Sequence, residues 1–94
     1  MVEPFRVEVS DAVLRDLQER LARTRLPDEV PDTGWEYGTN LAYMRELLDY
    51  WRTKYDWRKH EAALNRFKQF TAEVDGLRLH FIHEQGRGPN PKPL

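Results

Sequence analysis

The stretch Tyr50–Phe67, with the sequence YWRTKYDWRKHEAALNRF, carries more structural signals than any other part of the chain. Apolar residues recur at steps of three and four up to Tyr55, which is the spacing of one face of an amphipathic helix. Asp56 is a residue type that caps helices, so a further helix is predicted from Trp57 to about Phe67. Two consecutive helices are therefore expected here. The first of them has a predicted apolar stripe made of Leu41, Met44, Leu48, Trp51 and Tyr55.

The chain upstream predicts a strand, a helix and a long loop. Residues 5–9 alternate apolar and charged side chains, which is typical of a half-buried strand, and Pro4 suits an edge position. Ser10 is expected to cap a helix that ends near residue 25, because the chain before Pro27 avoids helical geometry. Residues 26–39 then form a loop that ends where Thr39 or Asn40 caps the next helix. A loop of this length is usually functional or packed on another surface.

The C-terminal third predicts a β-hairpin. Asp75-Gly76 stands between two alternating runs, and this dipeptide favours the positive φ angles of a tight hairpin turn. In the second run, three apolar residues at 77, 79 and 81 share one face, and residues 78, 80 and 82 share the other. The expected fold is mainly α with a short N-terminal strand and a C-terminal hairpin (α+β). The expected divisions are a helical segment at 1–68, the hairpin at 69–85 and a loop at 86–94.

Composition excludes several classes of function. Ninety-four residues form one domain at most, and the net charge of −1 predicts no general attraction to nucleic acid or anionic lipid. The chain has no cysteine, so neither a disulfide nor a thiol nucleophile is possible. No apolar run approaches the ~20 residues of a membrane span, and the N-terminus does not resemble a signal peptide. A cytoplasmic location without membrane or nucleic-acid partners is therefore expected.

No group of residues in the sequence predicts catalysis, cofactor binding or metal binding. His80 and His83 are three residues apart on a predicted strand and point to opposite faces, and His60 has no histidine or cysteine one turn away. Ser10, the only serine, is explained as a helix cap. The basic and aromatic residues at 51–59 would suit a nucleic-acid surface, but the slightly acidic chain argues against one. We therefore expect no catalytic residue, no cofactor and no metal ligand.

Aromatic residues instead predict packing surfaces. Trp35 and Tyr37 lie in the long loop, where the simpler interpretation is that they cover the core of this domain. Glu61 is unusual because it lies on the apolar side of its predicted helix. It would pair with Arg58 one turn back or with a group on another domain. The residues proposed to pack between domains are Trp35, Trp51, Tyr55, Trp57 and Glu61.

Several motifs together resemble one family, the microsomal-type epoxide hydrolases, over essentially the whole chain. The segments resemble the N-terminal region of that family, and the resemblance continues into the first hairpin of the family's α/β-hydrolase domain. They are Pro4–Val9, Thr24–Asp28, Gly34–Gly38, Tyr50–Arg58 with Glu61, Leu64 and Asn65, Phe70–Gly76 and Leu79–His83.

The resemblance implies a structural segment of an epoxide hydrolase. In that family the N-terminal segment wraps around catalytic α/β-hydrolase and cap domains, which would be the partners of this chain. The family opens epoxides to diols with an aspartate nucleophile, a histidine–acid pair and cap tyrosines. No position of this chain matches these residues, and Tyr37, Tyr43, Tyr50 and Tyr55 lack the context of the cap tyrosines. The chain is thus expected to precede the catalytic core, to be inactive alone and to resemble the soluble bacterial members.

Two alternatives remain open from the residues alone. One is a stand-alone, non-catalytic helical module that docks a partner protein through its exposed aromatic residues, and this includes the possibility of a homo-oligomer. The other is a self-sufficient small domain, which would unfold cooperatively as a monomer.

Overall fold

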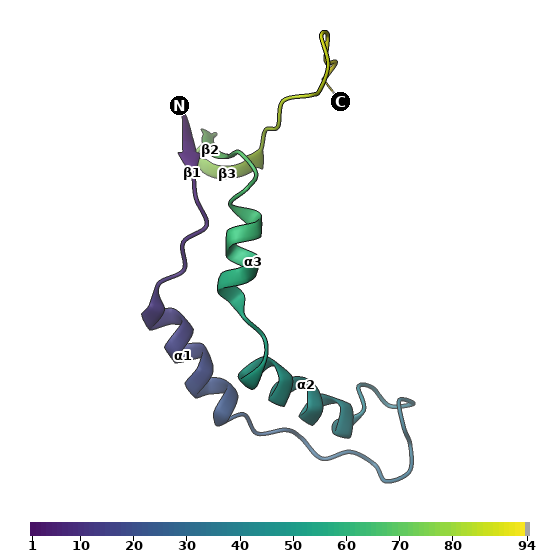
Figure 1. The fold of residues 1–94 in the computed structure, drawn as a ribbon. Coiled ribbons are helices and arrows are strands. Elements are labelled where there is room, and N and C mark those ends of the chain that lie inside the picture. Colours follow the sequence, from purple (N-terminus) through teal and green to yellow (C-terminus); the bar gives the residue numbers. More distant parts are fainter. Residues whose placement is uncertain (94) are drawn as a thin grey trace. The chain divides into compact units, whose positions relative to one another are not determined.

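The structure is a computed structural model that describes residues 1–93 and falls into two compact units. The sheet unit comprises Met1–Glu8 together with the chain from Trp57 onward, and the helical unit comprises Val9–Asp56. The elements, labelled in Figure 1, are β1 (Val2–Phe5), α1 (Asp11–Ala22), α2 (Leu41–Thr53), α3 (Trp57–Leu64), β2 (Gln69–Val74) and β3 (Leu77–Ile82).

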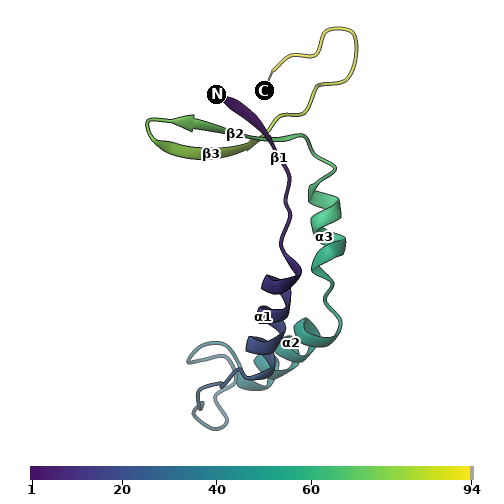
Figure 2. The ribbon, with the colours of Figure 1, turned by 90° about the vertical axis from the view of Figure 1, so that its left-hand side faces the viewer.

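The sheet unit contains an antiparallel sheet in the order β1-β2-β3. Asp75 and Gly76 have φ angles of 51° and 77°, so the predicted hairpin turn is confirmed, and Figure 2 shows β2 and β3 joined by it. The N-terminal strand pairs with β2, with Val2 opposite Ala72. The predicted α+β composition is therefore confirmed. Its strands form one sheet, although they come from opposite ends of the chain.

The N-terminal strand is displaced from its predicted position. It was expected at residues 5–9, but β1 covers Val2–Phe5. The reason is the register: Phe5 lies opposite Gln69, the first residue of β2, so no partner strand remains for the residues that follow. The predicted edge position is confirmed, and it explains why Pro4, which has no backbone N–H, is accommodated there.

The helix α3 ends three residues before its predicted limit. It was expected to reach about Phe67, but it ends at Leu64. The backbone N–H groups of Arg66 and Phe67 donate to carbonyls three residues back, which is the tighter geometry common at helix ends. The chain then turns directly into β2.

The helical unit pairs α1 with α2. Ser10 caps α1 as predicted, with its hydroxyl accepting from the Val13 N–H at 3.3 Å. The helix ends at Ala22 instead of near residue 25, and there the Thr24 hydroxyl donates to the Arg20 carbonyl. Leu21 is the one buried apolar side chain among residues 1–93.

The second helix of this unit is also shorter than its apolar stripe. Asn40 caps α2 with its side-chain oxygen 3.0 Å from the Tyr43 nitrogen, so the second of the two predicted caps is the observed one. The helix ends at Thr53, and Tyr55 therefore lies beyond it, not on its stripe as predicted. Within residues 1–93, no helix is both long enough and apolar enough to cross a membrane.

Candidate functional site

The two faces of the sheet differ sharply in chemistry. Residues directly opposite each other in an antiparallel pair point to the same face, and neighbours along a strand alternate. The register therefore assigns every strand residue to a face. What we call the apolar face contains Val2, Pro4, Phe70, Ala72, Val74, Leu77, Leu79 and Phe81. The opposite face, called the polar face, contains Glu3, Phe5, Gln69, Thr71, Glu73, Arg78, His80 and Ile82.

Two polar side chains of this sheet are buried, while apolar side chains on its other face are exposed. On the polar face, Gln69 and Thr71 are each only 6% exposed. On the apolar face, Leu79 is 50% exposed and Leu77 is 67% exposed. Apolar side chains normally lie inside and polar ones outside, so an open apolar sheet face marks an interaction surface.

Gln69 is buried with both ends of its side-chain amide hydrogen-bonded. Its side-chain nitrogen donates to the Leu64 carbonyl at 2.7 Å, which links the end of α3 to β2. Its side-chain oxygen lies 2.9 Å from Nε2 of His80. Because an amide oxygen only accepts, Nε2 of His80 carries the proton. The His80 ring also meets the edge of Phe5, with ring centroids 5.0 Å apart.

Asn65 joins the N-terminal segment to the end of α3. Its side-chain oxygen accepts from the Val7 N–H at 2.8 Å, and its side-chain nitrogen donates to the Val7 carbonyl at 2.8 Å. The amide therefore replaces the strand partner that β2 no longer provides beyond Phe5. With Gln69, it ties three segments of the sheet unit together through side-chain amides.

The predicted candidates Trp57 and Glu61 lie together on α3. The Trp57 indole N–H donates to one Glu61 carboxylate oxygen at 3.2 Å, and Arg58 binds the other oxygen at 2.8 Å. The predicted pairing of Glu61 with Arg58 is thus observed, and it accounts for a carboxylate on the buried side of a helix.

Trp51 and Tyr55 come together in the helical unit. With Leu47 and Tyr50 they line a shallow, mostly apolar hollow of about 260 Å³ on one side of α2. These four side chains are all exposed. Trp35 lies apart from this hollow, with its ring 5.2 Å from that of Tyr43. Trp35 and Tyr37 remain largely exposed, so in residues 1–93 they do not form a covered core.

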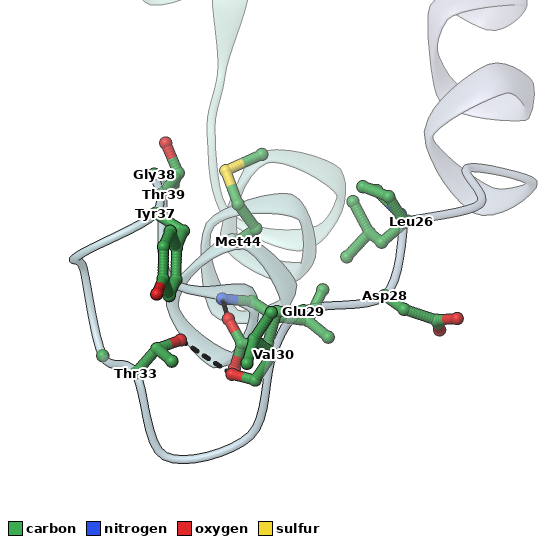
Figure 3. A pocket seen from close by; sticks show the side chains of 12 residues that line it. Leu26, Asp28, Glu29, Val30, Thr33, Tyr37, Gly38, Thr39 and Met44 are labelled. Carbon is green, nitrogen blue, oxygen red and sulfur yellow. Dashed lines mark hydrogen bonds between the residues drawn. The ribbon is translucent and has the colours of Figure 1, made fainter.

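The loop before α2 encloses a second hollow, of about 460 Å³ (Figure 3). Leu26, Val30 and Met44 line it together with Tyr37. The loop is closed by Glu29, whose carboxylate accepts from the Leu41 N–H at 2.8 Å. Glu29 therefore supplies a negative charge at the N-terminus of α2, where the helix dipole favours one.

The arrangement presents surfaces suited to packing. The side chain of His80 is engaged with Gln69 and Phe5, and Ser10 is a helix cap. Among residues 1–93, no three metal-ligating side chains come together. The features that the two units present are an apolar sheet face in one and an aromatic hollow in the other.

Comparison with known proteins identifies the family. The model of the epoxide hydrolase N terminus matches residues 2–94. The chain belongs to this family. It is 41% identical over 93 residues to the "Putative epoxide hydrolase" of Stigmatella aurantiaca, and 37% identical over 97 residues to epoxide hydrolase 1 of Sus scrofa.

The epoxide hydrolase relatives are much longer than this chain. The alignments cover 99% of the chain but only 21% of each of these two relatives, so the chain spans about a fifth of their length. Solved structures of epoxide hydrolases also match this chain over only part of their length. The juvenile hormone epoxide hydrolase of the silkworm Bombyx mori matches 95% of the chain with a TM-score of 0.87 and 26% identity, over 21% of its own chain. The epoxide hydrolase of Aspergillus niger matches 87% of the chain with a TM-score of 0.80 and 29% identity.

Sequence reasoning found the aromatic candidates and missed the amides. Asn65 and Gln69 carry side-chain hydrogen bonds that join the segments of the sheet unit, yet neither was singled out for a role. No local signal was present for Asn65, because the backbone groups that it binds are 58 residues away in the sequence. For Gln69 the sequence offered only a polar residue at the first position of a strand.

Proposed function

We propose that this chain is the non-catalytic, structural N-terminal segment of an epoxide hydrolase. Its partners are the catalytic α/β-hydrolase and cap domains, on the same or a separate chain. The parent opens epoxides to vicinal diols through an aspartate nucleophile outside this chain. The observation that carries the proposal is the family match over residues 2–94 with a coverage of about a fifth of each relative.

The finer division of the chain belongs to the same proposal. Residues 1–68 form the N-terminal segment, residues 69–85 form the first hairpin of the α/β-hydrolase domain, and residues 86–94 lead into that domain. Trp35, Trp51, Tyr55, Trp57 and Glu61 pack against the catalytic domains. The exposure of Trp35, Trp51 and Tyr55 supports this role. Trp57 and Glu61 bind each other on α3, so their part in the packing would be to hold that helix in place. The cytoplasmic location expected from the sequence stays a prediction.

A second candidate function is a stand-alone interaction module. The aromatic hollow formed by Leu47, Tyr50, Trp51 and Tyr55 favours it, because aromatic clusters of this kind are typical of protein interfaces. The two candidates differ in whether the chain is required by an epoxide hydrolase.

A chimaera tests the structural role. The matched 93 residues of the Stigmatella relative are replaced by this chain, and hydrolysis of styrene oxide is compared among the intact relative, the chimaera and a form that lacks the segment. We expect the chimaera to retain activity and the shortened form to lose it. Full activity of the shortened form would refute the proposal, and turnover by the purified 94-residue chain alone would refute its non-catalytic part.

A further inference from the structure

We propose that the outer edge of β1 is closed to a second copy of this chain by two of its own residues. Pro4 removes a backbone donor from that edge, and Glu3 brings a negative charge against its own counterpart. Both effects follow from the register of β1, so they are independent of the proposed function.

One hydrogen bond fixes the direction of the backbone groups along β2. The N–H of His83, just after β3, donates to the carbonyl of Lys68, just before β2, at 2.9 Å. Lys68 therefore directs its backbone groups toward the β3 side of the sheet. Because these groups alternate along an antiparallel strand, Gln69 and Thr71 direct theirs toward β1.

The register then divides the residues of β1 between its two edges. Phe5 lies opposite Gln69, and both direct their backbone groups into the ladder between β1 and β2. Glu3 and Thr71 form the next pair of this kind. Pro4 stands between Phe5 and Glu3 and faces the outer edge, which no strand among residues 1–93 occupies. Since proline has no N–H, Pro4 leaves the ladder with β2 intact and removes a donor only from the outer edge.

A second copy would meet this edge in an antiparallel arrangement centred on Glu3. Val2 is the other residue of β1 that faces outward, and two-fold symmetry places it opposite residue 4 of the other copy. Facing residues of this kind exchange both of their N–H···O bonds. Because Pro4 cannot donate, half of the hydrogen bonds of such a pairing are missing.

Glu3 opposes the same pairing electrostatically. In the symmetric arrangement it lies opposite its own counterpart as a non-hydrogen-bonded pair, in which side chains approach most closely. Like charges that face each other directly across strands are destabilising. The strand is also only four residues long and exposed throughout. Short length, charge and proline are the means by which natural proteins protect sheet edges, and β1 combines them.

Sedimentation velocity of three proteins over a series of concentrations tests this edge. They are the unsubstituted chain, Pro4→Thr, and Pro4→Thr combined with Val2→Pro. Pro4→Thr supplies the missing N–H with a residue that suits a strand. Val2→Pro then removes the N–H of the other outward residue and serves as the matched control. Association through other exposed surfaces is common to all three proteins, and far-UV circular dichroism checks that the fold is kept.

We expect Pro4→Thr to self-associate at least about tenfold more tightly than the unsubstituted chain, because each copy gains a hydrogen bond at the edge. The variant that also carries Val2→Pro is expected to return to the level of the unsubstituted chain. Association of Pro4→Thr that equals that of the unsubstituted chain, or that survives Val2→Pro, would overturn the proposal.

The charge is tested by adding Glu3→Gln to Pro4→Thr. We expect self-association to tighten further, by up to about fivefold, because the facing carboxylates are removed. Unchanged association would overturn the role given to Glu3.

A second pair of variants tests the direction of the backbone groups even if Pro4→Thr does not fold. Val2→Pro removes an outward N–H, whereas Glu3→Pro removes an N–H that faces Thr71 in the ladder. We expect Glu3→Pro to lower the urea midpoint and Val2→Pro to leave it unchanged within error. Equal loss in both variants, or a larger loss in Val2→Pro, would mean that Pro4 does not face the outer edge and would overturn the proposal.

Discussion

Asn65 makes two hydrogen bonds to a residue far away in the sequence. One amide satisfies both backbone groups of Val7, at 2.8 Å each, across 58 positions of sequence. We expect Asn65→Ala to lower the free energy of unfolding by about 1–3 kcal/mol, because both Val7 groups lose their partner in a partly buried site. The urea midpoint measures this. Asn90→Ala, in the exposed C-terminal loop, is the matched control, and equal midpoints for the two variants would contradict the role given to Asn65.

The Trp57–Glu61 contact is the second testable contact at the residue scale. A double-mutant cycle with Trp57→Phe and Glu61→Gln removes the indole donor and the carboxylate charge separately and together. We expect a coupling free energy of about 0.5–1.5 kcal/mol, the usual value of one hydrogen bond to a partly buried group. Urea unfolding of the four proteins gives the coupling. A value within error of zero would show that the indole and the carboxylate stabilise the fold independently.

At the scale of elements, local sequence signals predicted which helices and strands form, but they predicted poorly where β1 and α3 begin or end. The hairpin turn and the caps Ser10 and Asn40 depend on short-range chemistry, and all were predicted from it. The limits of β1 and α3 depend on partners distant in sequence. The first ends where β2 begins, and the second ends where the chain turns toward β2. No local pattern contains that information, so both elements were predicted too far along the chain.

For the candidate site, too, local spacing was informative and contacts between distant segments were not foreseen. Spacing predicted that residues 77, 79 and 81 share a sheet face. Trp51 and Tyr55 line one hollow, but Tyr55 does so from beyond the end of α2 and not from the predicted helical stripe. Spacing did not predict that the sheet face stays open, because burial depends on what lies against the sheet. It also missed the pairing of β1 with β2, which requires knowledge of register between the two ends of the chain.

Glu29 links the loop at residues 26–39 to the start of α2. Its carboxylate binds the Leu41 N–H at the start of α2, in a first turn that has no acidic residue of its own. We expect Glu29→Gln to speed hydrogen exchange of the Leu41 amide by about two- to fivefold, as expected for loss of an anion at a helix N-terminus. Asp28→Asn, at the neighbouring exposed position, is the control. An unchanged rate in Glu29→Gln would mean that the amide of glutamine holds the loop equally well and that the charge is unimportant.

At the scale of the whole molecule, the two units share a chemical property. Each unit is held together by hydrogen bonds between its own residues, and each leaves a cluster of apolar side chains exposed. In the helical unit these side chains surround the hollow on α2, and in the sheet unit they form the apolar face. Leu21, which is 9% exposed, is the one buried apolar side chain among residues 1–93, so a chain of this size has little core of its own. The segment proposed above would gain further burial from the rest of an epoxide hydrolase.

The apolar face makes a matched comparison possible on one strand. Leu79 is 50% exposed on the apolar face, and Ile82 is 52% exposed on the polar face. In the isolated chain, we expect Leu79→Thr to reduce the fluorescence of the hydrophobic dye ANS more than Ile82→Thr does. The reason is that the dye binds contiguous apolar surface, to which Leu79 contributes and Ile82 does not. Both variants replace an exposed aliphatic side chain with a β-branched residue suited to strands, so the fold is retained in each. Far-UV circular dichroism checks this. If both variants lower the fluorescence equally while the fold is kept, the dye is not reporting on this face, and the open surface must be sought on α2.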